Sequence, residues 1–471
     1  MVRSGVRTVR PSFDRLEDRW VPAGNVTVSI VTVVMAGASV RTLVLSGDNL
    51  TNGIDISQTA VNQYTVTGID LNGATSVNGT PDGSFVASNI GRISVSLLAG
   101  DDSLQFGIHS PGTITLAGNL NINMGAGNDT ITTAGGGTPL NVGNLAVVNG
   151  AGNCSTTLTD IKVGGAASFN HTAGGDETLL VSSSTATENS FASFTYTGGT
   201  GDDSIDVKDS NVNGNVSVSM GAGNVAGQGG HFGFFSTNGS TNLQLIKGSL
   251  TITNSSGTFD DDIDDTSVNG NVSIRAGTGS SNVLQWETNP DIVASPVVKG
   301  HMTLTSGGDS PTVLIAGSNQ SVSILGGLTI SLGSSTGQAL VRLNGLTTVG
   351  NLSSTGGIGI TTGSGDDIVL IDSVDAGSTF HGAVSINTGL GNDSIQINGA
   401  GTAATNFLVG ITVNQGAGDD SLELGNTGPV KFFKAATFRG GATGDVNNTV
   451  LEVLANISGG SVTPTLTNYH P

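Results

Sequence analysis

The sequence predicts an all-β protein, a parallel β-helix (solenoid) of roughly 14 coils of about 26 residues each. Three observations lead to this fold class. Glycine is abundant, with 73 of 471 residues, while aromatic residues make up 4% and charged residues 11%, which is atypical of a compact globular enzyme. A Gly-x-Gly turn recurs at a nearly constant spacing, and pairs of apolar residues keep the same position relative to each turn. The usual hand of parallel crossovers favours a right-handed coil.

The turn spacing defines the length of one coil. Two intervals between successive turn glycines are roughly twice as long as the others. Each fits two periods, with Phe259 and Gly337 at the missing positions. The second glycine of each turn falls at Gly100, Gly127, Gly152, Gly175, Gly201, Gly223, Gly279, Gly308, Gly365, Gly391, Gly418 and Gly444.

Apolar residues flank each turn on both sides. Ile93 and Val95 precede Gly100 with polar neighbours, and the same alternation recurs before later turns, which predicts a strand leading into the turn. Leu104 and Phe106 follow Gly100 in the same way and predict a strand leaving it. The remainder of the period has room for a third short strand and two more corners. Glycine suits these corners because it adopts positive φ angles without strain.

The chain divides into four segments. Residues 1–23 are rich in arginine and differ sharply in composition from the rest of the chain, so they are interpreted as a targeting or processing segment. Residues 24–95 have strand and turn chemistry without clear Gly-x-Gly turns, and they are interpreted as irregular first coils or an N-terminal cap. Residues 96–450 carry the β-helix repeats, and residues 451–471 are expected to form a C-terminal cap or tail.

Charge and composition exclude several classes of function. The net charge is -20, and beyond residue 23 the chain holds 11 basic and 33 acidic residues, a net charge of -22, which argues against binding nucleic acid or anionic lipid. No apolar run is long enough to span a membrane. Cys154 is the only cysteine, so a disulfide framework and a zinc cluster built of cysteines are both excluded.

The segment FDRLEDRWVPA, residues 13–23, resembles the short N-terminal motif L-E-x-R-x-x-P-A of exported and surface proteins of planctomycete bacteria. Leu16, Glu17, Arg19, Pro22 and Ala23 carry the match. The resemblance implies export to an extracellular or cell-surface location and implies nothing about activity.

The stretch GGTGDDSID, residues 198–206, resembles the calcium-binding nonapeptide G-G-x-G-x-D-x-U-x of RTX proteins. The resemblance implies calcium as a cofactor, because calcium prefers ligand sets made only of oxygen atoms. RTX nonapeptides follow one another directly, whereas these turns are about 26 residues apart. Glu177 would be a weaker substitute and Asp261 an unusual ligand. The implied metal ligands are Asp102, Asp129, Asp203, Asp367, Asp393 and Asp420.

Stacked coils would bring equivalent aspartates to within roughly 5 Å of one another. Like charges at that separation repel by an amount that depends on their exposure. Two interpretations therefore stand: the aspartates are solvated on open structural corners, or a cation such as calcium neutralises them.

The sequence favours an exported structural or adhesive surface protein, an acidic rod whose partners would be surface glycans or other cell-surface proteins. The alternative is a carbohydrate-active β-helix enzyme, a polysaccharide lyase or glycosidase. Arg275, interpreted as lying beside the acidic FDDDIDD run, is the best candidate for a catalytic site, but an Arg that neutralises an acidic corner is the simpler interpretation. The histidines show no metal-ligand spacing and are interpreted as scattered surface residues; they are His109, His171, His231, His301, His381 and His470.

Overall fold

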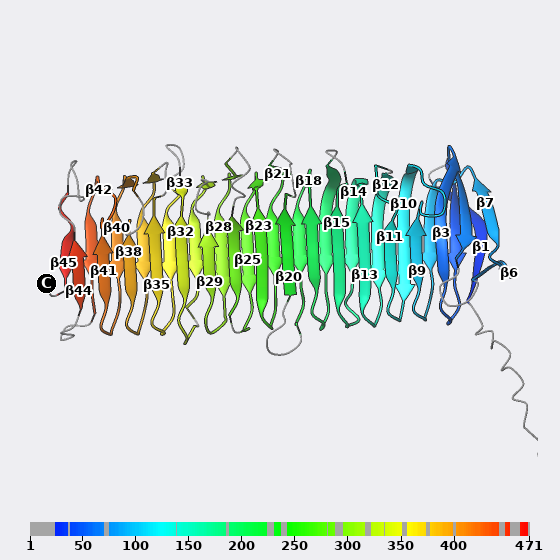
Figure 1. Ribbon diagram of the computed structural model, residues 1–471. Coiled ribbons are helices and arrows are strands. Elements are labelled where there is room, and N and C mark those ends of the chain that lie inside the picture. The colour runs from blue at the N-terminus through cyan, green and yellow to red at the C-terminus, as the bar shows by residue number, and fades with distance from the viewer. Residues whose placement is uncertain are drawn as a thin grey trace, which may run out of the picture.

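The chain folds into a long rod of stacked coils (Figure 1). The structure is a computed structural model, and it has only β-strands as regular secondary structure among the residues it describes. The rod is a parallel β-solenoid with turns of about 27 residues, and the number and size of its coils are close to those predicted. The described residues are 24–35, 38–69, 75–137, 139–184, 188–223, 230–236, 243–279, 281–287, 295–315, 322–333, 335–350, 356–373, 377–398, 402–441, 448–452 and 462–469.

Each coil contributes one strand to a first sheet, and these strands pair in parallel with their equivalents in the neighbouring coils. The strands of the first sheet are β9 (Ser103–Phe106), β11 (Thr130–Thr133), β13 (Cys154–Thr159), β15 (Glu177–Ser182), β17 (Ser204–Lys208), β20 (Gly230–Phe235), β23 (Phe259–Asp264), β26 (Val283–Glu287), β29 (Thr312–Ile315), β32 (Leu340–Asn344), β35 (Ile368–Asp372), β38 (Ser394–Ile397), β41 (Ser421–Leu424) and β44 (Thr449–Glu452).

A second sheet takes the rest of each coil, first as one long strand and later as two short strands separated by a bend. It begins with the short strand β8 (Arg92–Ser96), and its long strands are β10 (Ile114–Gly125), β12 (Leu140–Asn149), β14 (Ile161–Asn170) and β16 (Asn189–Thr197). Its short strands are β18 (Ser210–Val212), β19 (Val216–Ser219), β21 (Gln244–Ile246), β22 (Leu250–Thr253), β24 (Thr266–Val268), β25 (Val272–Ala276), β27 (Val297–Val298), β28 (Met302–Ser306), β30 (Val322–Ile324), β31 (Leu328–Ser331), β33 (Leu346–Val349), β34 (Ile358–Thr361), β36 (Ser378–Phe380), β37 (Val384–Asn387), β39 (Thr405–Phe407), β40 (Ile411–Asn414), β42 (Val430–Phe432), β43 (Ala436–Arg439) and β45 (Thr465–Thr467).

Apolar side chains fill the interior of the coils. Along β17 buried and partly exposed residues alternate, so Ile205 and Val207 point inward while their polar neighbours point out. Ile205 stands in register with Leu179 of the preceding coil, and this register repeats along both sheets. The apolar side chains therefore form one continuous core along the rod.

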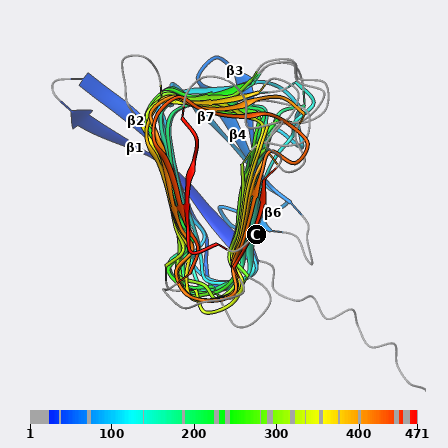
Figure 2. The same ribbon diagram turned by 90° about the vertical axis from the view of Figure 1, so that its left-hand side faces the viewer.

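The rod begins with antiparallel strands at its N-terminal end. β1 (Asn25–Met35) and β2 (Ala38–Ser46) form a hairpin, and β4 pairs antiparallel with both β3 and β7. β2 and β3 then pair in parallel with β8 and β9, which begins the regular stack. Figure 2, a view along the rod, shows the β1–β2 hairpin extending beyond the outline of the superposed coils. The remaining strands of this region are β3 (Gly53–Ala60), β4 (Gln63–Gly68), β5 (Ser76–Val77), β6 (Thr80–Pro81) and β7 (Ser84–Ser88).

The two ends of the chain are described only in part. The predicted targeting segment, residues 1–23, lies outside the described residues, as does most of the segment 451–471. Within that last segment, β45 pairs in parallel with β43 and continues the second sheet. Within the described part of the chain, no helix has the length and apolar character needed to cross a membrane.

Candidate functional site at the corner of the coils

All six predicted metal ligands lie in one column that runs along the rod. The column, called the corner column below, holds the residue at which each coil enters the first sheet. Parallel strand register aligns these residues from coil to coil. The members are Asn52, Asp102, Asp129, Cys154, Glu177, Asp203, Gly230, Phe259, Asn282, Pro311, Ala339, Asp367, Asp393, Asp420 and Asn448.

The aspartates of the corner column point into the coil. Each of the six is at most 1% exposed. The interpretation of the column as solvated, open corners is therefore wrong. The Gly-x-Gly turn explains the inward direction, because glycine lets the backbone turn sharply just before the aspartate: Gly127 has a φ of +148° and Gly418 a φ of +146°.

Each carboxylate holds the preceding coil through a backbone hydrogen bond. The backbone N–H of Asp367 donates to Oδ1 of Asp393 at 2.9 Å, and that of Asp393 donates to Oδ1 of Asp420 at 3.0 Å. Asn448 continues this ladder, since its Oδ1 accepts the N–H of Asp420 at 2.7 Å. Hydrogen bonds from buried N–H groups to a charged acceptor are worth about 1.5–3 kcal/mol each, so the ladder is one source of the rod's stability.

The second carboxylate oxygen is the unusual feature. Oδ2 of Asp102, Asp129, Asp203 and Asp393 is buried without a hydrogen-bond partner. Asn282 shows what this position accommodates. Its Oδ1 joins the same ladder, and its Nδ2 donates to the carbonyl oxygen of Gly277 at 3.0 Å and to Oγ of Ser306 at 2.9 Å. An aspartate places an oxygen acceptor where Asn282 has a donor, so a proton or a cation is needed to complement it.

Two other aspartates of the corner column do have a hydrogen-bond donor for Oδ2. Oδ2 of Asp367 accepts the N–H of Gly363 at 3.2 Å, and Oδ2 of Asp420 accepts that of Gly441 at 3.2 Å.

Burial raises the pKa of Asp102 to about 7, although the backbone N–H of Asn52 opposes the shift. Burial likewise raises the pKa of Asp129 to about 6 and that of Asp393 to about 7. Removal from water thus disfavours the bare carboxylate at these three positions.

Asp261 lies outside the corner column, contrary to its interpretation as an unusual member. Phe259 occupies the column in that coil, and Asp261 lies two residues further along β23, in register with Leu284. Its side chain is buried among the core residues, and this desolvation raises its pKa well above the ordinary value. Within β23, Asp261 thus points inward while Asp260, Asp262 and Asp264 point outward, and Asp265, which follows the strand, is also buried.

Outward-facing Asp264 carries a prediction about pH. Its Oδ1 is buried without a partner, and burial, with the negative charges of Asp262, Asp265 and Glu287, raises its pKa to about 7. A pKa raised by folding stabilises the protein at low pH, and this stabilisation is lost as pH rises from about 4 to about 7.

We therefore expect Asp264→Asn to raise the free energy of unfolding by about 1–2 kcal/mol at about pH 8, a value discounted for partial exposure, and to give no advantage at about pH 4. Thermal unfolding at the two pH values measures this. Asp82→Asn, at an exposed position, is the matched control and should change neither midpoint. A gain for Asp264→Asn that does not depend on pH would contradict the electrostatic explanation.

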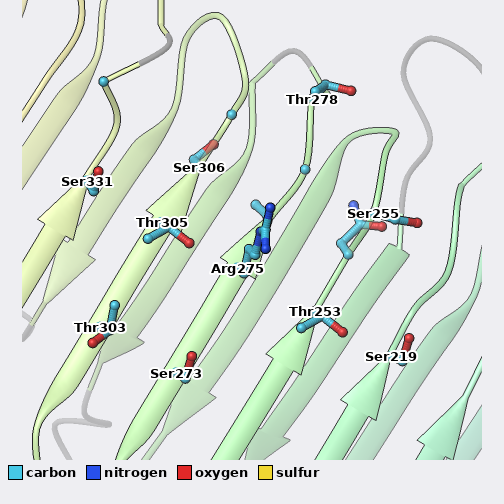
Figure 3. Close-up of a pocket in the computed structure, with 15 residues that line it drawn as sticks. Ser219, Thr253, Ser255, Ser273, Arg275, Thr278, Thr303, Thr305, Ser306 and Ser331 are labelled. Atoms are coloured by element: carbon cyan, nitrogen blue, oxygen red, sulfur yellow. The ribbon is translucent and has the colours of Figure 1, made fainter.

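The groove around Arg275 does not support a lyase site. Arg275 lies on β25 of the second sheet, whereas the acidic run lies on β23 of the first sheet. The interpretation that Arg275 lies beside the run is therefore wrong. Figure 3 shows Arg275 among serine and threonine side chains from neighbouring strands. The groove has a volume of about 870 Å³, and the described residues that line it include no carboxylate. A lyase or glycosidase needs acidic groups beside its base, and this groove lacks them.

One histidine differs from the surface residue that the sequence suggested. His171 is buried, at 1% exposure, and its Nδ1 lies 3.6 Å from Oε2 of Glu177 in the corner column. His231 is partly exposed and pairs with Asp206 at 3.3 Å and with Asp260 at 3.6 Å. Alignment of the repeats did not single out His171, because the spacing to the corner residue changes from coil to coil. His171 stands six residues before Glu177, whereas the equivalent Gly198 stands five residues before Asp203.

Comparison with protein-family models, with curated proteins and with solved structures found no match to this chain.

Proposed function

We propose that this protein is an exported structural or adhesive rod of the cell surface, and that calcium binds along its corner column. One observation carries the proposal: buried carboxylate oxygens without a donor recur in the same column in several coils. A catalytic carboxylate pair would be expected at one place only. A repeated feature along the axis serves the whole rod, and its simplest role is to hold the coils together.

Calcium suits the chemistry of the column. Asp102 and Asp129 occupy consecutive coils, and so do Asp367, Asp393 and Asp420, so equivalent carboxylates lie roughly 5 Å apart. Each offers a hard, charged oxygen, and the glycine turns beside them are rich in backbone carbonyls, which together make an oxygen-only environment. A divalent cation there would neutralise the carboxylates and complement the Oδ2 atoms that lack a donor, those of Asp102, Asp129 and Asp393.

Export and adhesion rest on other features. The resemblance of residues 13–23 to the planctomycete motif supports export. The net charge of -20 supports partners that are neutral or cationic, such as surface glycans or other cell-surface proteins, rather than nucleic acid. Surface proteolysis of intact cells, or antibody labelling without permeabilisation, tests whether the protein is exposed on the cell surface.

Thermal unfolding examines the calcium part. In millimolar calcium we expect the midpoint to rise by roughly 5 °C or more relative to the same protein in a chelator, because ions that bind only the folded state stabilise it by mass action. Magnesium at the same concentration should give a smaller shift, since it requires near-ideal octahedral geometry and gives up its water reluctantly. Identical unfolding curves in calcium and in chelator would remove calcium from the proposal and leave the structural rod.

A further inference from the structure

A buried cluster of four residues that can bind a metal lies inside three consecutive coils. Cys154, Glu177 and Asp203 are successive members of the corner column, and His171 follows the end of β14. The four residues are between 1% and 4% exposed. In the described structure the cluster departs from the surrounding column, because Cys154 and Glu177 stand where the two preceding members, Asp102 and Asp129, are aspartates.

Three of the four residues have ligand atoms close enough to share one ion, and Asp203 lies beside His171. Nδ1 of His171 lies 3.6 Å from Oε2 of Glu177 and 3.8 Å from Oδ1 of Asp203. Ligand atoms of Cys154, His171 and Glu177 all lie within 4.8 Å of one another. Hydrogen bonds between nitrogen and oxygen are shorter, at about 2.7–3.2 Å. Two atoms bound to one tetrahedral metal at about 2.0–2.3 Å are roughly 3.2–3.8 Å apart, which matches the measured separations.

Two polar atoms of the cluster are without hydrogen-bond partners. Nδ1 of His171 and Oδ2 of Asp203 are both buried and unpartnered. Nε2 of His171 lies 3.2 Å from the carbonyl oxygen of Gly152, which can only accept, so Nε2 carries the proton in that contact. When Nε2 alone carries a proton, Nδ1 presents its lone pair to two carboxylates, and a cation between them would make this arrangement favourable.

The surroundings orient these ligands as they do in known metal sites. A metal-binding histidine usually donates its other N–H to a carbonyl or carboxylate, and His171 has Gly152 in that role. Asn149 donates from Nδ2 to Oε2 of Glu177 at 2.7 Å and fixes that carboxylate. Gly198, the equivalent of His171 in the next coil, leaves room for the cluster: a Cβ there would lie 1.9 Å from Oδ2 of Asp203.

We propose that Cys154, His171, Glu177 and Asp203 bind one divalent transition-metal ion of the zinc class in the interior of the rod. One thiolate, one imidazole and two carboxylates suit zinc or cobalt, whereas calcium prefers oxygen ligands only. Four protein ligands fill a tetrahedral shell, which is the pattern of a structural site rather than a catalytic one. The site joins three coils. It shares Asp203 with the corner column, but Asp102, Asp129, Asp367, Asp393 and Asp420 lie outside it, so the calcium proposal can fail while this one stands.

Metal analysis and cobalt substitution test this site in the full chain. Protein folded in the presence of zinc should retain one zinc per chain after extensive dialysis, and excess calcium should not displace it. Protein folded with Co²⁺ in place of zinc should show a thiolate-to-cobalt charge-transfer band and strong tetrahedral ligand-field bands. Cys154→Ser should abolish the charge-transfer band. Asp393→Asn, a change elsewhere in the same column, is the matched control and should retain both spectral features and the stoichiometry.

A second variant keeps the test decisive if Cys154→Ser does not fold. Glu177→Gln preserves the size of the side chain, and we expect it to weaken cobalt affinity by about 100-fold or more, because it replaces a charged ligand. Circular dichroism verifies that each variant is folded. The proposal is overturned if wild-type protein folded with zinc or cobalt holds neither metal, if the charge-transfer band survives in folded Cys154→Ser, or if Glu177→Gln binds cobalt as tightly as the wild type.

Discussion

Gly416→Ala is expected to lower the free energy of unfolding by about 3 kcal/mol or more. Gly416 has a φ of +86°, which strains any residue with a side chain. In addition, a Cβ at this position would lie 1.5 Å from the carbonyl oxygen of Gly389 in the preceding coil, and that oxygen already accepts the N–H of Ala417 at 3.2 Å. The backbone itself would have to move, and the contact between the two coils would be disturbed.

Gly359→Ala is the matched control for that substitution. Gly359 lies in β34, and a Cβ added there would meet no heavy atom within 4 Å. The change should be within about 0.5 kcal/mol of neutral, or slightly stabilising, because alanine reduces the freedom of the unfolded chain. Thermal and urea unfolding of both variants, with limited proteolysis to detect local opening, measures the difference. Equal effects of the two substitutions would mean that the close packing of glycine turns does not hold the coils together.

The repeat could be predicted because its signals are local and periodic. Turn glycines and apolar pairs define a coil wherever they recur, and the predicted strands on both sides of Gly100 are β8 and β9. The predicted number of coils is close to the observed number, and the irregular first segment, residues 24–95, contains antiparallel hairpins. Phe259 was wrongly placed at a glycine position. Gly257 takes that position, as its carbonyl oxygen lies 1.9 Å from a Cβ built on Gly279.

The candidate site was only partly accessible to sequence reasoning. The spacing correctly aligned Asp102, Asp129 and the later aspartates in one column, because register follows from the period. The inward direction of their side chains did not follow, since alternation of faces holds within a strand and breaks at a glycine corner. The position of His171 beside Cys154 depends on stacking between coils. The signal that could have revealed it is the replacement of aspartate by Cys154 and Glu177 at successive corners.

Asp393→Ala should destabilise the rod by about 2–3 kcal/mol, and Asp393→Asn should change the stability of the metal-free protein by less than about 1 kcal/mol. Alanine removes the acceptor at Oδ1 and leaves the backbone N–H of Asp367 buried without its partner. Asparagine retains that acceptor, and Asn282 and Asn448 already occupy the column with the same hydrogen bond. Chemical unfolding in the presence of a chelator measures both values. A similar loss for the two variants would mean that charge, not the ladder, is what Asp393 contributes.

The same pair separates the ladder from calcium binding. Asp393→Asn keeps the hydrogen bond and removes the negative charge, so we expect it to reduce the calcium-dependent rise in the thermal midpoint while leaving the chelated protein unchanged. Asp366→Asn is the matched control, because Asp366 precedes the column residue in its coil, is exposed, and also accepts a backbone N–H, that of Asn392 at 2.7 Å. If Asp366→Asn reduces the calcium response as much as Asp393→Asn does, the ions bind the outer surface of the corner rather than the buried column.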